Sequence, residues 1–168
     1  MRFTPAALAL ALLAGVTSSM SHSATPNPLD PRAAALVQQG RAALGVGKID
    51  EAIDAYESAL AIQPGHVAIY LNLAEATRKQ GMQGKALHYY RQALKIDPSN
   101  QYAIAGEGAA LVEKGAVEKA RRNLTRLQQL CGGDCAASLE LAAAIQKGPA
   151  PQVVTADQVK PQSMVTPE

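Results

Sequence analysis

The chain has 168 residues, enough for one ordinary domain, and its formal net charge is +2. Aromatic residues make up only 4% of the sequence, with no Trp, so a hydrophobic core must come from Ala, Leu, Ile, Val and a few Tyr. The near-neutral charge argues against a nucleic-acid partner that is attracted by a global positive field.

The first 24 residues have the order of a secretory signal peptide. A short positive region at Arg2 precedes an apolar run from Ala6 to Val16, and a small polar stretch leads to Ala24. As a helix the run would be about 16 Å long, half the thickness of a bilayer core, so a stable membrane span is not expected. We expect cleavage near residues 21–24 and export, into the periplasm if the source is a Gram-negative bacterium. Residues 25–32 would follow as a linker.

An internal repeat of 34 residues occupies the middle of the chain. Residues 36–64 align with residues 70–98, which pairs Gly47 with Gly81, Tyr56 with Tyr90 and Pro64 with Pro98. A third and weaker copy follows at the same spacing. The three units run over 33–66, 67–100 and 101–134.

Each unit is predicted to form two helices. The expected helices span 32–44, 49–62, 67–80, 83–96, 101–114 and 117–130. Glycines end the first helix of each unit, where a left-handed backbone is cheap only for Gly. Pro64 and Pro98 end the second helices, because Pro cannot continue a helix and forces the preceding residue to be extended.

One further helix is expected over 136–146. It would cap the last unit, with Leu139, Ala142, Ala143 and Ile145 on its apolar side. Residues 147–168 contain four prolines and no periodicity, and they are predicted to be a disordered tail.

The repeats resemble the tetratricopeptide repeat, a helix–turn–helix with small residues, an aromatic residue and Pro at fixed columns. The matching packing positions are Gly40, Ala52, Tyr56, Ala59, Pro64, Ala74, Ala86, Tyr90, Ala93, Pro98, Gly108 and Ala120. The third unit departs at three columns, where Leu124, Leu127 and Gly132 stand. The resemblance implies an all-α fold over 33–146, a right-handed helical-hairpin solenoid of three units plus a C-terminal capping helix. Small residues would let helices approach closely, and the aromatic residue would fill the gap between adjacent units.

In this family, ligands usually lie along the concave face that the first helices form. By column, that face would hold Val37, Arg41, Leu44, Leu71, Asn72, Glu75, Arg78, Tyr102, Ala105, Ala109 and Val112, with Lys79 at its edge. This mixture, which leans towards apolar residues, suits a groove for a peptide or a helix.

Some members of the family hold a chaperone's C-terminal carboxylate with five Lys, Asn or Arg columns. Those columns are Val37, Arg41, Asn72, Tyr102 and Gly106 in this sequence. Only Asn72 matches, and Arg41 is merely basic, which argues against a clamp for a chaperone tail.

Cys131 and Cys135 enclose two glycines and Asp134, between the last repeat helix and the capping helix. An even number of cysteines in an exported chain predicts one disulfide, which here would fix the angle of the cap. The spacing differs from the C-x-x-C of thioredoxin-like motifs, and a metal site would need two further ligands. Free thiols, a redox-active pair and a metal site stay as alternatives.

Two charged groups lie on or near the second helices. The acidic group comprises Asp50, Glu51, Asp54 and Glu57, and the basic group comprises Lys114, Lys119, Arg121, Arg122 and Arg126. We interpret both as solvated helix faces.

Glu107 stands at a usually apolar column, and the sequence offers no reason for it. Its neighbours Gly106 and Gly108 indicate close helix packing.

The sequence contains no G-x-S-x-G, H-E-x-x-H, P-loop or G-x-G-x-x-G motif. We therefore predict a non-enzymatic scaffold for protein–protein interaction, without a cofactor or a metal. It would be an assembly factor, or an accessory subunit of an envelope, pilus or secretion complex. The alternatives are a thiol-redox helper that uses Cys131 and Cys135, and a homo-oligomeric structural protein. The repeat columns encode the scaffold and do not name the partner.

Overall fold

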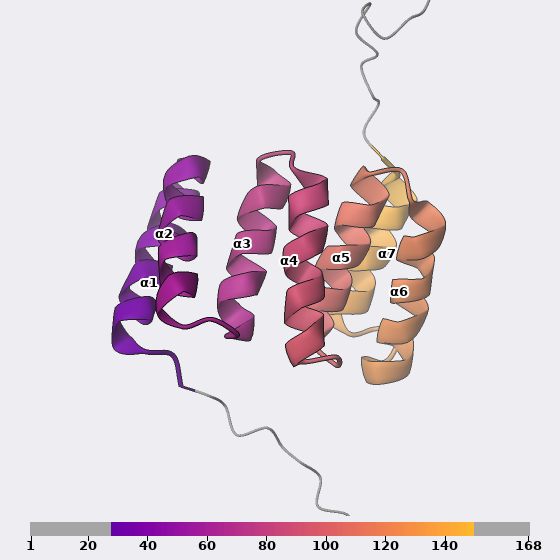
Figure 1. Ribbon diagram of the computed structural model, residues 1–168. Coiled ribbons are helices and arrows are strands. Elements are labelled where there is room, and N and C mark those ends of the chain that lie inside the picture. Colours follow the sequence, from indigo (N-terminus) through magenta and orange to yellow (C-terminus); the bar gives the residue numbers. More distant parts are fainter. Residues whose placement is uncertain (1–27, 150–168) are drawn as a thin grey trace, which may run out of the picture.

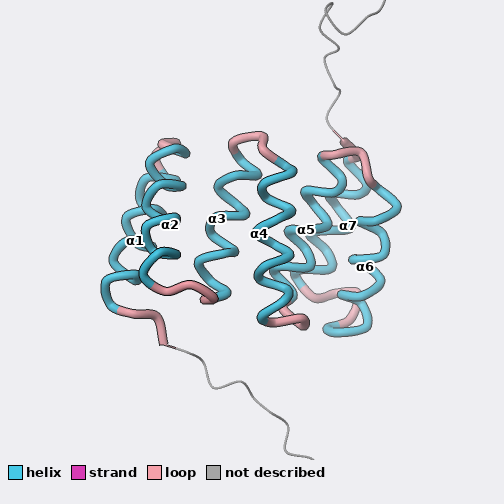
Figure 2. Tube along the Cα trace, in the orientation of Figure 1, coloured by secondary structure: helices cyan, strands magenta, loops and turns pink. Residues whose placement is uncertain are grey.

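The computed structural model describes residues 28–149, which form seven helices and no strand (Figures 1 and 2). The helices are α1 (Pro31–Gly45), α2 (Ile49–Ile62), α3 (Val67–Lys79), α4 (Gln83–Ile96), α5 (Gln101–Glu113), α6 (Val117–Cys131) and α7 (Ala136–Lys147). The predicted all-α class is confirmed, and each predicted helix end is met to within one residue. No helix within 28–149 is both long and apolar enough to cross a membrane.

The predicted leader and most of the predicted linker and tail lie outside the described residues. The linker was predicted to reach residue 32, which is wrong at its end because α1 already begins at Pro31. Proline suits the first position of a helix, where its missing N–H costs nothing. The carboxylate of Asp30 caps this helix by accepting the N–H of Arg32 at 2.8 Å. The predicted tail likewise starts one residue too early, at residue 147, because α7 includes Lys147.

Glycine and proline set the ends of the other helices, as predicted. The residues that follow α1, α3 and α5 include glycines with positive φ angles of 79°, 83° and 79°, at Gly47, Gly81 and Gly115. Only Gly adopts this backbone without strain. Helices α2 and α4 end two residues before Pro64 and Pro98, and Gln63 and Asp97 have φ angles of −131° and −128°.

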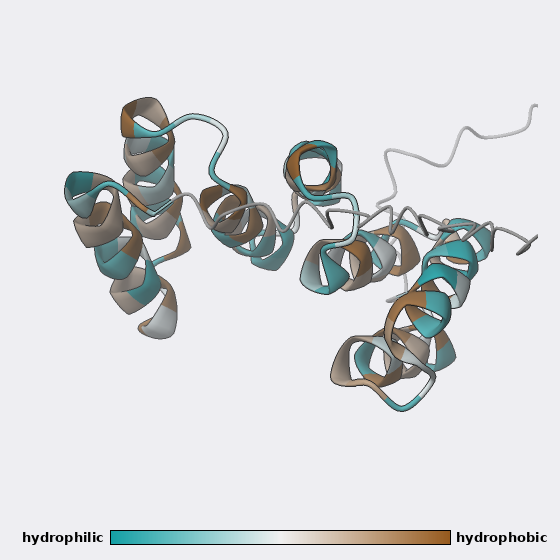
Figure 3. Cartoon of the chain, turned by 90° about the horizontal axis from the view of Figure 1, so that it is seen from below, coloured by the Kyte–Doolittle hydropathy of each residue, from teal (hydrophilic) through white to brown (hydrophobic). Residues whose placement is uncertain are grey.

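The helices form two layers. Each hairpin packs its own two helices together, and the first helices α1, α3 and α5 also contact one another in turn, with α7 against α5. The second helices α2, α4 and α6 have no such mutual backbone contact within the described chain. The first helices and α7 therefore form the inner face of the array, and α2, α4 and α6 form its outer face. Seen from below, the hairpins follow one another as successive groups, with hydrophobic and hydrophilic residues on different sides of the helices (Figure 3).

The core consists of two clusters that follow the repeat. One joins α1, α2 and α3 around Tyr56, Ile69 and Leu73, and the other runs from α3 to α7 around Tyr90, Ile104 and Leu127. The predicted packing positions are all buried except Pro64 and Pro98, which lie exposed in the turns after α2 and α4.

Two tyrosine rings lie directly on glycine backbone. A Cβ atom on Gly40 would sit 2.4 Å from Cε1 of Tyr56, and one on Gly106 would sit 2.3 Å from Cε1 of Tyr90. Tyr90 thereby joins α4 to α5 of the next unit, as predicted for the aromatic column. Tyr56 lies on Gly40 of its own unit. Any side chain at these glycines would displace a ring that has almost no free space around it.

Glu107 has a structural explanation that the sequence did not reveal. Its side chain is only 13% exposed and pairs with Nε of Arg91 at 2.9 Å. Nδ2 of Asn123 donates to its other oxygen at 3.0 Å. The carboxylate thus ties α5 to both α4 and α6, and these two partners offset the cost of burying its charge.

Helix α7 packs only partly on the predicted side, with Ile145 against the core and Ala142 half-buried as predicted. Its buried residues are Ala137, Ser138 and Leu141, whereas Leu139 is 56% exposed and Ala143 is also exposed. The reason is a close approach to α5, because a Cβ on Gly108 would lie 2.6 Å from the methyl groups of Leu141. That fit sets the rotation of α7 and turns Leu139 outward.

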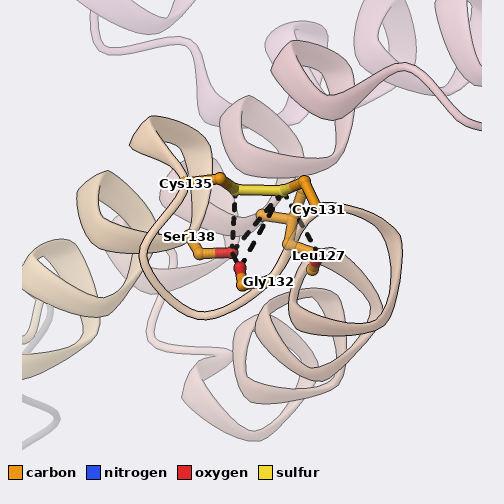
Figure 4. Close-up of a disulfide and its surroundings, with 5 residues drawn as sticks. All are labelled: Leu127, Cys131, Gly132, Cys135 and Ser138. Atoms are coloured by element: carbon orange, nitrogen blue, oxygen red, sulfur yellow. Dashed lines mark hydrogen bonds between the residues drawn. A yellow bond between two sulfur atoms is a disulfide. The ribbon is translucent and has the colours of Figure 1, made fainter.

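The loop before α7 is closed by a disulfide between Cys131 and Cys135, whose Cα atoms lie 5.9 Å apart (Figure 4). Gly132 in this loop has a φ of +91°. The hydroxyl of buried Ser138 donates to the carbonyl of Gly132 at 2.8 Å, so the loop is tied to α7 from within.

We expect Gly40→Ala to lower the free energy of unfolding by about 1–3 kcal/mol, because fully buried Tyr56 has no room to move. Gly84→Ala in α4 is the matched control, since nothing lies within 4 Å of its added methyl group. The control should be neutral or slightly stabilising. Urea unfolding measures both, and a Gly40→Ala protein as stable as the wild type would contradict the packing described.

In native protein, Cys131 and Cys135 should resist alkylation until they are reduced. Replacing both by Ser should lower the free energy of unfolding by about 2 kcal/mol on the chain-entropy model, because the closed loop is short. Mass spectrometry after alkylation tests the first point and urea unfolding the second. Labelling of both thiols in freshly isolated protein would show that the pair is not a stable disulfide.

Candidate protein-binding groove

A groove of about 280 Å³ lies on the inner face between α3, α5 and α7. Its lining comprises Leu71, Asn72, Glu75, Arg78, Tyr90, Tyr102, Ala105, Gly106, Ala109 and Glu140. A wider hollow of about 720 Å³ adjoins it, towards the C-terminal ends of α5 and α7. Arg78, Ala109 and Glu140 line both, so the two form one continuous depression.

The structure brings together most of the residues that were predicted for this face. Leu71, Asn72, Glu75, Arg78, Tyr102, Ala105 and Ala109 line the groove, and Lys79 and Val112 line the hollow. Tyr102 is 75% exposed, which is unusual for an aromatic side chain. Val112 is 2% exposed and adds little surface.

The first unit contributes less than predicted. Val37 is 2% exposed and packs in the core of α1, α2 and α3, so it has no surface to offer to a ligand. Leu44 is half-buried against the same core. Arg41 is exposed, and its Nε donates to Oδ1 of Asn72 at 3.4 Å, which places the guanidinium beside the α3 edge of the groove.

An ion network forms part of the groove floor. Arg78 on α3 pairs with Glu75 of the same helix at 3.0 Å and with Glu113 at the end of α5. The hydroxyl of Tyr90 donates to Glu75 at 3.2 Å. These contacts connect three helices, so they hold the groove in one shape before any ligand arrives.

Burial and neighbouring charges shift the pKa values of Arg78 and Tyr90 in this network. Burial acts to lower the pKa of Arg78, but the carboxylates of Glu75 and Glu113 outweigh it and raise the pKa. Burial, with the charge of Glu75, raises the pKa of Tyr90 well above its ordinary value. Arg78 therefore stays charged and Tyr90 stays protonated at physiological pH, and Arg78 is already neutralised by its own neighbours.

The residues predicted for this face did not include Tyr90, Gly106 and Glu140 of the groove, or Glu113 of the adjoining hollow. Tyr90 was assigned only to packing, although its hydroxyl reaches the groove. Glu140 lies one repeat length after Gly106, so extending the 34-residue spacing into α7 would have found it. Glu113 carries no signal of its own, because its role depends on how close α5 comes to Arg78.

The side chains that line the groove are of the kinds that bind a ligand by contact. It combines an exposed ring, short aliphatic side chains and polar groups at the margins, a composition typical of recognition surfaces. Within residues 28–149, no three His, Cys, Asp or Glu side chains gather in a way that could hold a metal ion.

Known proteins share the helical repeat architecture described above. Residues 37–101 match the family model of the tetratricopeptide repeat. The first tetratricopeptide domain of Spaghetti (RPAP3), solved with the HSP90 peptide SRMEEVD, is 26% identical, with a TM-score of 0.62 over 69% of this chain and 92% of that one. The Sgt2 tetratricopeptide domain from Aspergillus fumigatus is 25% identical, with a TM-score of 0.64 over 80% of this chain and 94% of that one.

One curated relative, the protein CTR9 homolog of Arabidopsis thaliana, is 30% identical over 95 residues. These residues are 56% of this chain but only 9% of that protein, so the chain spans a small part of its relative's length. Both the family match and the solved structures point to the same repeat architecture. The helical array of residues 31–147 therefore has the architecture of a tetratricopeptide-repeat domain, and residues 37–101 within it match that family's model.

Proposed function

We propose that this protein is an exported, non-catalytic scaffold that holds a short segment of a partner protein in the groove between α3, α5 and α7. The observation that carries the proposal is the lining of that groove. An exposed aromatic ring, Tyr102, and half-buried Leu71 stand over a floor that the Arg78 network keeps rigid. Aromatic anchors of this kind supply much of the affinity in protein interfaces.

The size of the groove favours a peptide or a helix as the ligand. Its volume of about 280 Å³ is at the lower end for ligand pockets, and the larger hollow continues it along the array. A segment that inserts one or two apolar side chains beside Tyr102 and runs towards α7 would match this shape. Flat contact with a whole domain would leave the depression unfilled.

The α1 end of the groove favours an acidic group on the ligand. Arg41 is exposed and makes no ion pair with any described residue. The buried hydroxyl of Tyr56 has no hydrogen-bond partner among residues 28–149. Burial raises the pKa of Tyr56, and the positive charge of Arg41 acts to lower it. A carboxylate beside Arg41 would receive a charge-assisted hydrogen bond.

The comparisons support a peptide ligand without naming it. The Spaghetti domain was solved with a chaperone peptide. In this chain, however, the columns associated with a chaperone-tail clamp hold Val37, Tyr102 and Gly106 instead of Lys or Arg, and Val37 is buried. We therefore propose a different protein segment as the ligand.

The proposed place of action is outside the cytoplasm. The leader of residues 1–24 lies outside the described structure, and its order of charge, apolar run and polar stretch supports export. A disulfide at Cys131 and Cys135 would persist in an oxidising compartment. An assembly factor or an accessory subunit of an envelope, pilus or secretion complex fits both features.

The direct experiment is photo-crosslinking in the native compartment. A benzoylphenylalanine placed at position 102 should capture the partner, and the same residue at exposed position 88 on the outer face should not. Capture at position 88 alone would move the binding site to α2, α4 and α6 and overturn the proposal.

Substitutions in the groove should weaken binding of the captured partner. We expect Tyr102→Ala to raise the Kd at least tenfold, because it removes the exposed anchor, and Arg41→Glu to raise it about tenfold through repulsion of an acidic group. Leu130→Ala and Lys95→Glu are the matched controls on the outer helices and should leave the Kd unchanged. Isothermal titration calorimetry gives the values, and equal effects in groove and control variants would count against this site.

Replacing Cys131 and Cys135 by Ser separates a scaffold from a thiol-redox helper. A structural disulfide predicts that the Kd for the partner is retained below the melting temperature of the variant. A redox role predicts that function is lost while the fold persists, which circular dichroism and a complementation assay would reveal together.

Export predicts that the mature protein has lost its leader near residues 21–24. Intact-mass measurement of protein isolated from its native source tests this directly. A native protein that retains Met1–Val16 would contradict cleavage, and cell fractionation would then locate it.

A further inference from the structure

The outer face of the array is divided by charge. Helix α2 carries only acidic charges, at Asp50, Glu51, Asp54 and Glu57. Helix α4 carries only basic ones, at Lys85, Arg91 and Lys95. Helix α6 carries Lys119, Arg121, Arg122 and Arg126 against the single acid Glu118. The charge thus changes sign from one end of the face to the other.

Internal ion pairs neutralise most of the middle of this face. Lys85 of α4 pairs with Glu57 at 3.1 Å, and Arg91 pairs with Glu107 at 2.9 Å. Lys95 of α4 is exposed and makes no ion pair within residues 28–149, and further unpaired charges lie at the two ends, where Glu51 already pairs with Lys48 at 2.8 Å. Asp54 on α2 and Lys119 and Arg122 on α6 are exposed, and none of them makes an ion pair within residues 28–149.

The repeat makes the two ends geometrically equivalent. Glu51 and Lys119 lie two repeat lengths apart, and so do Asp54 and Arg122. Each pair therefore occupies the same positions on the outer surfaces of α2 and α6, with opposite charge. A two-fold axis through α4 would place α2 of one copy over α6 of the other, and α6 over α2. Both contacts would be complementary in charge, and a symmetric dimer of this kind is the commonest closed assembly.

We propose that the outer face, formed by α2, α4 and α6, is a homodimer interface in which the acidic α2 of each copy docks on the basic α6 of its partner. The occupant is a second copy because the chain itself supplies the complementary surface. Pairs between exposed side chains contribute little each and are screened by salt, so the dimer is weak and forms at low ionic strength. The inner groove stays open in such a dimer, which presents two grooves on opposite sides.

Sedimentation velocity on the mature full-length protein at 20 and 500 mM NaCl tests the proposal. We expect concentration-dependent dimers at 20 mM NaCl and monomers at 500 mM NaCl. Two charge-reversal variants sharpen the test. Glu51→Lys with Asp54→Arg puts basic side chains at the two equivalent positions of α2 and leaves that helix neutral beside Asp50 and Glu57. Lys119→Glu with Arg122→Glu makes those positions of α6 acidic, so that both α2 and α6 carry net negative charge. Each variant alone should be monomeric, and an equimolar mixture should form heterodimers, because both α2–α6 contacts are again complementary.

The control is Lys114→Glu with Lys147→Glu, which changes net charge as much as the second variant but lies off α2, α4 and α6. It should dimerise like the wild type, and circular dichroism should show all variants folded. A wild-type protein that is monomeric at 20 mM NaCl overturns the proposal. So does a mixture of the two reversed variants that stays monomeric. Binding of the wild type to vesicles containing anionic lipid, lost in Lys119→Glu with Arg122→Glu and without self-association, would assign α6 to a membrane surface instead.

Discussion

The close approach of helix backbones beneath two tyrosine rings is the constraint on which the rest of the array depends. At Gly40 and Gly106 the rings of Tyr56 and Tyr90 occupy the space that a Cβ would need. Because the interior of a protein is packed as densely as a crystal, those contacts leave no freedom in how α1 meets α2 or how α4 meets α5. The same principle sets the cap, where Leu141 fills the space above Gly108 and fixes the rotation of α7.

The groove follows from this packing. Tyr90 lies on Gly106 with its ring and donates to Glu75 with its hydroxyl, so one side chain serves both the joint between units and the groove floor. Arg78 then links Glu75 to Glu113 across α3 and α5. A scaffold held in this way keeps its binding surface in one conformation and spares a ligand the cost of ordering it.

The helices and their ends could be predicted because glycine and proline act locally. The backbone at Gly47, Gly81 and Gly115 is one that only Gly adopts readily. The period of 34 residues then shows which positions of successive units are equivalent and share a helix face. What failed depends on tertiary distances. Val37 is buried because the first unit closes over it, Leu139 faces outward because Leu141 fits Gly108, and Glu113 reaches Arg78 only across the gap between α3 and α5. Periodicity alone contains none of these distances.

The central claim is that the inner face binds the partner, and methyl NMR of the full-length protein tests it most directly. With Ala and Leu methyl groups labelled, a titration with the captured partner segment at 500 mM NaCl should shift the signals of Leu71, Ala105 and Ala109 in the groove. The signals of Ala61 and Leu130 on the outer helices should not move. Shifts confined to Ala61 and Leu130, with the three groove signals unchanged, would contradict the account.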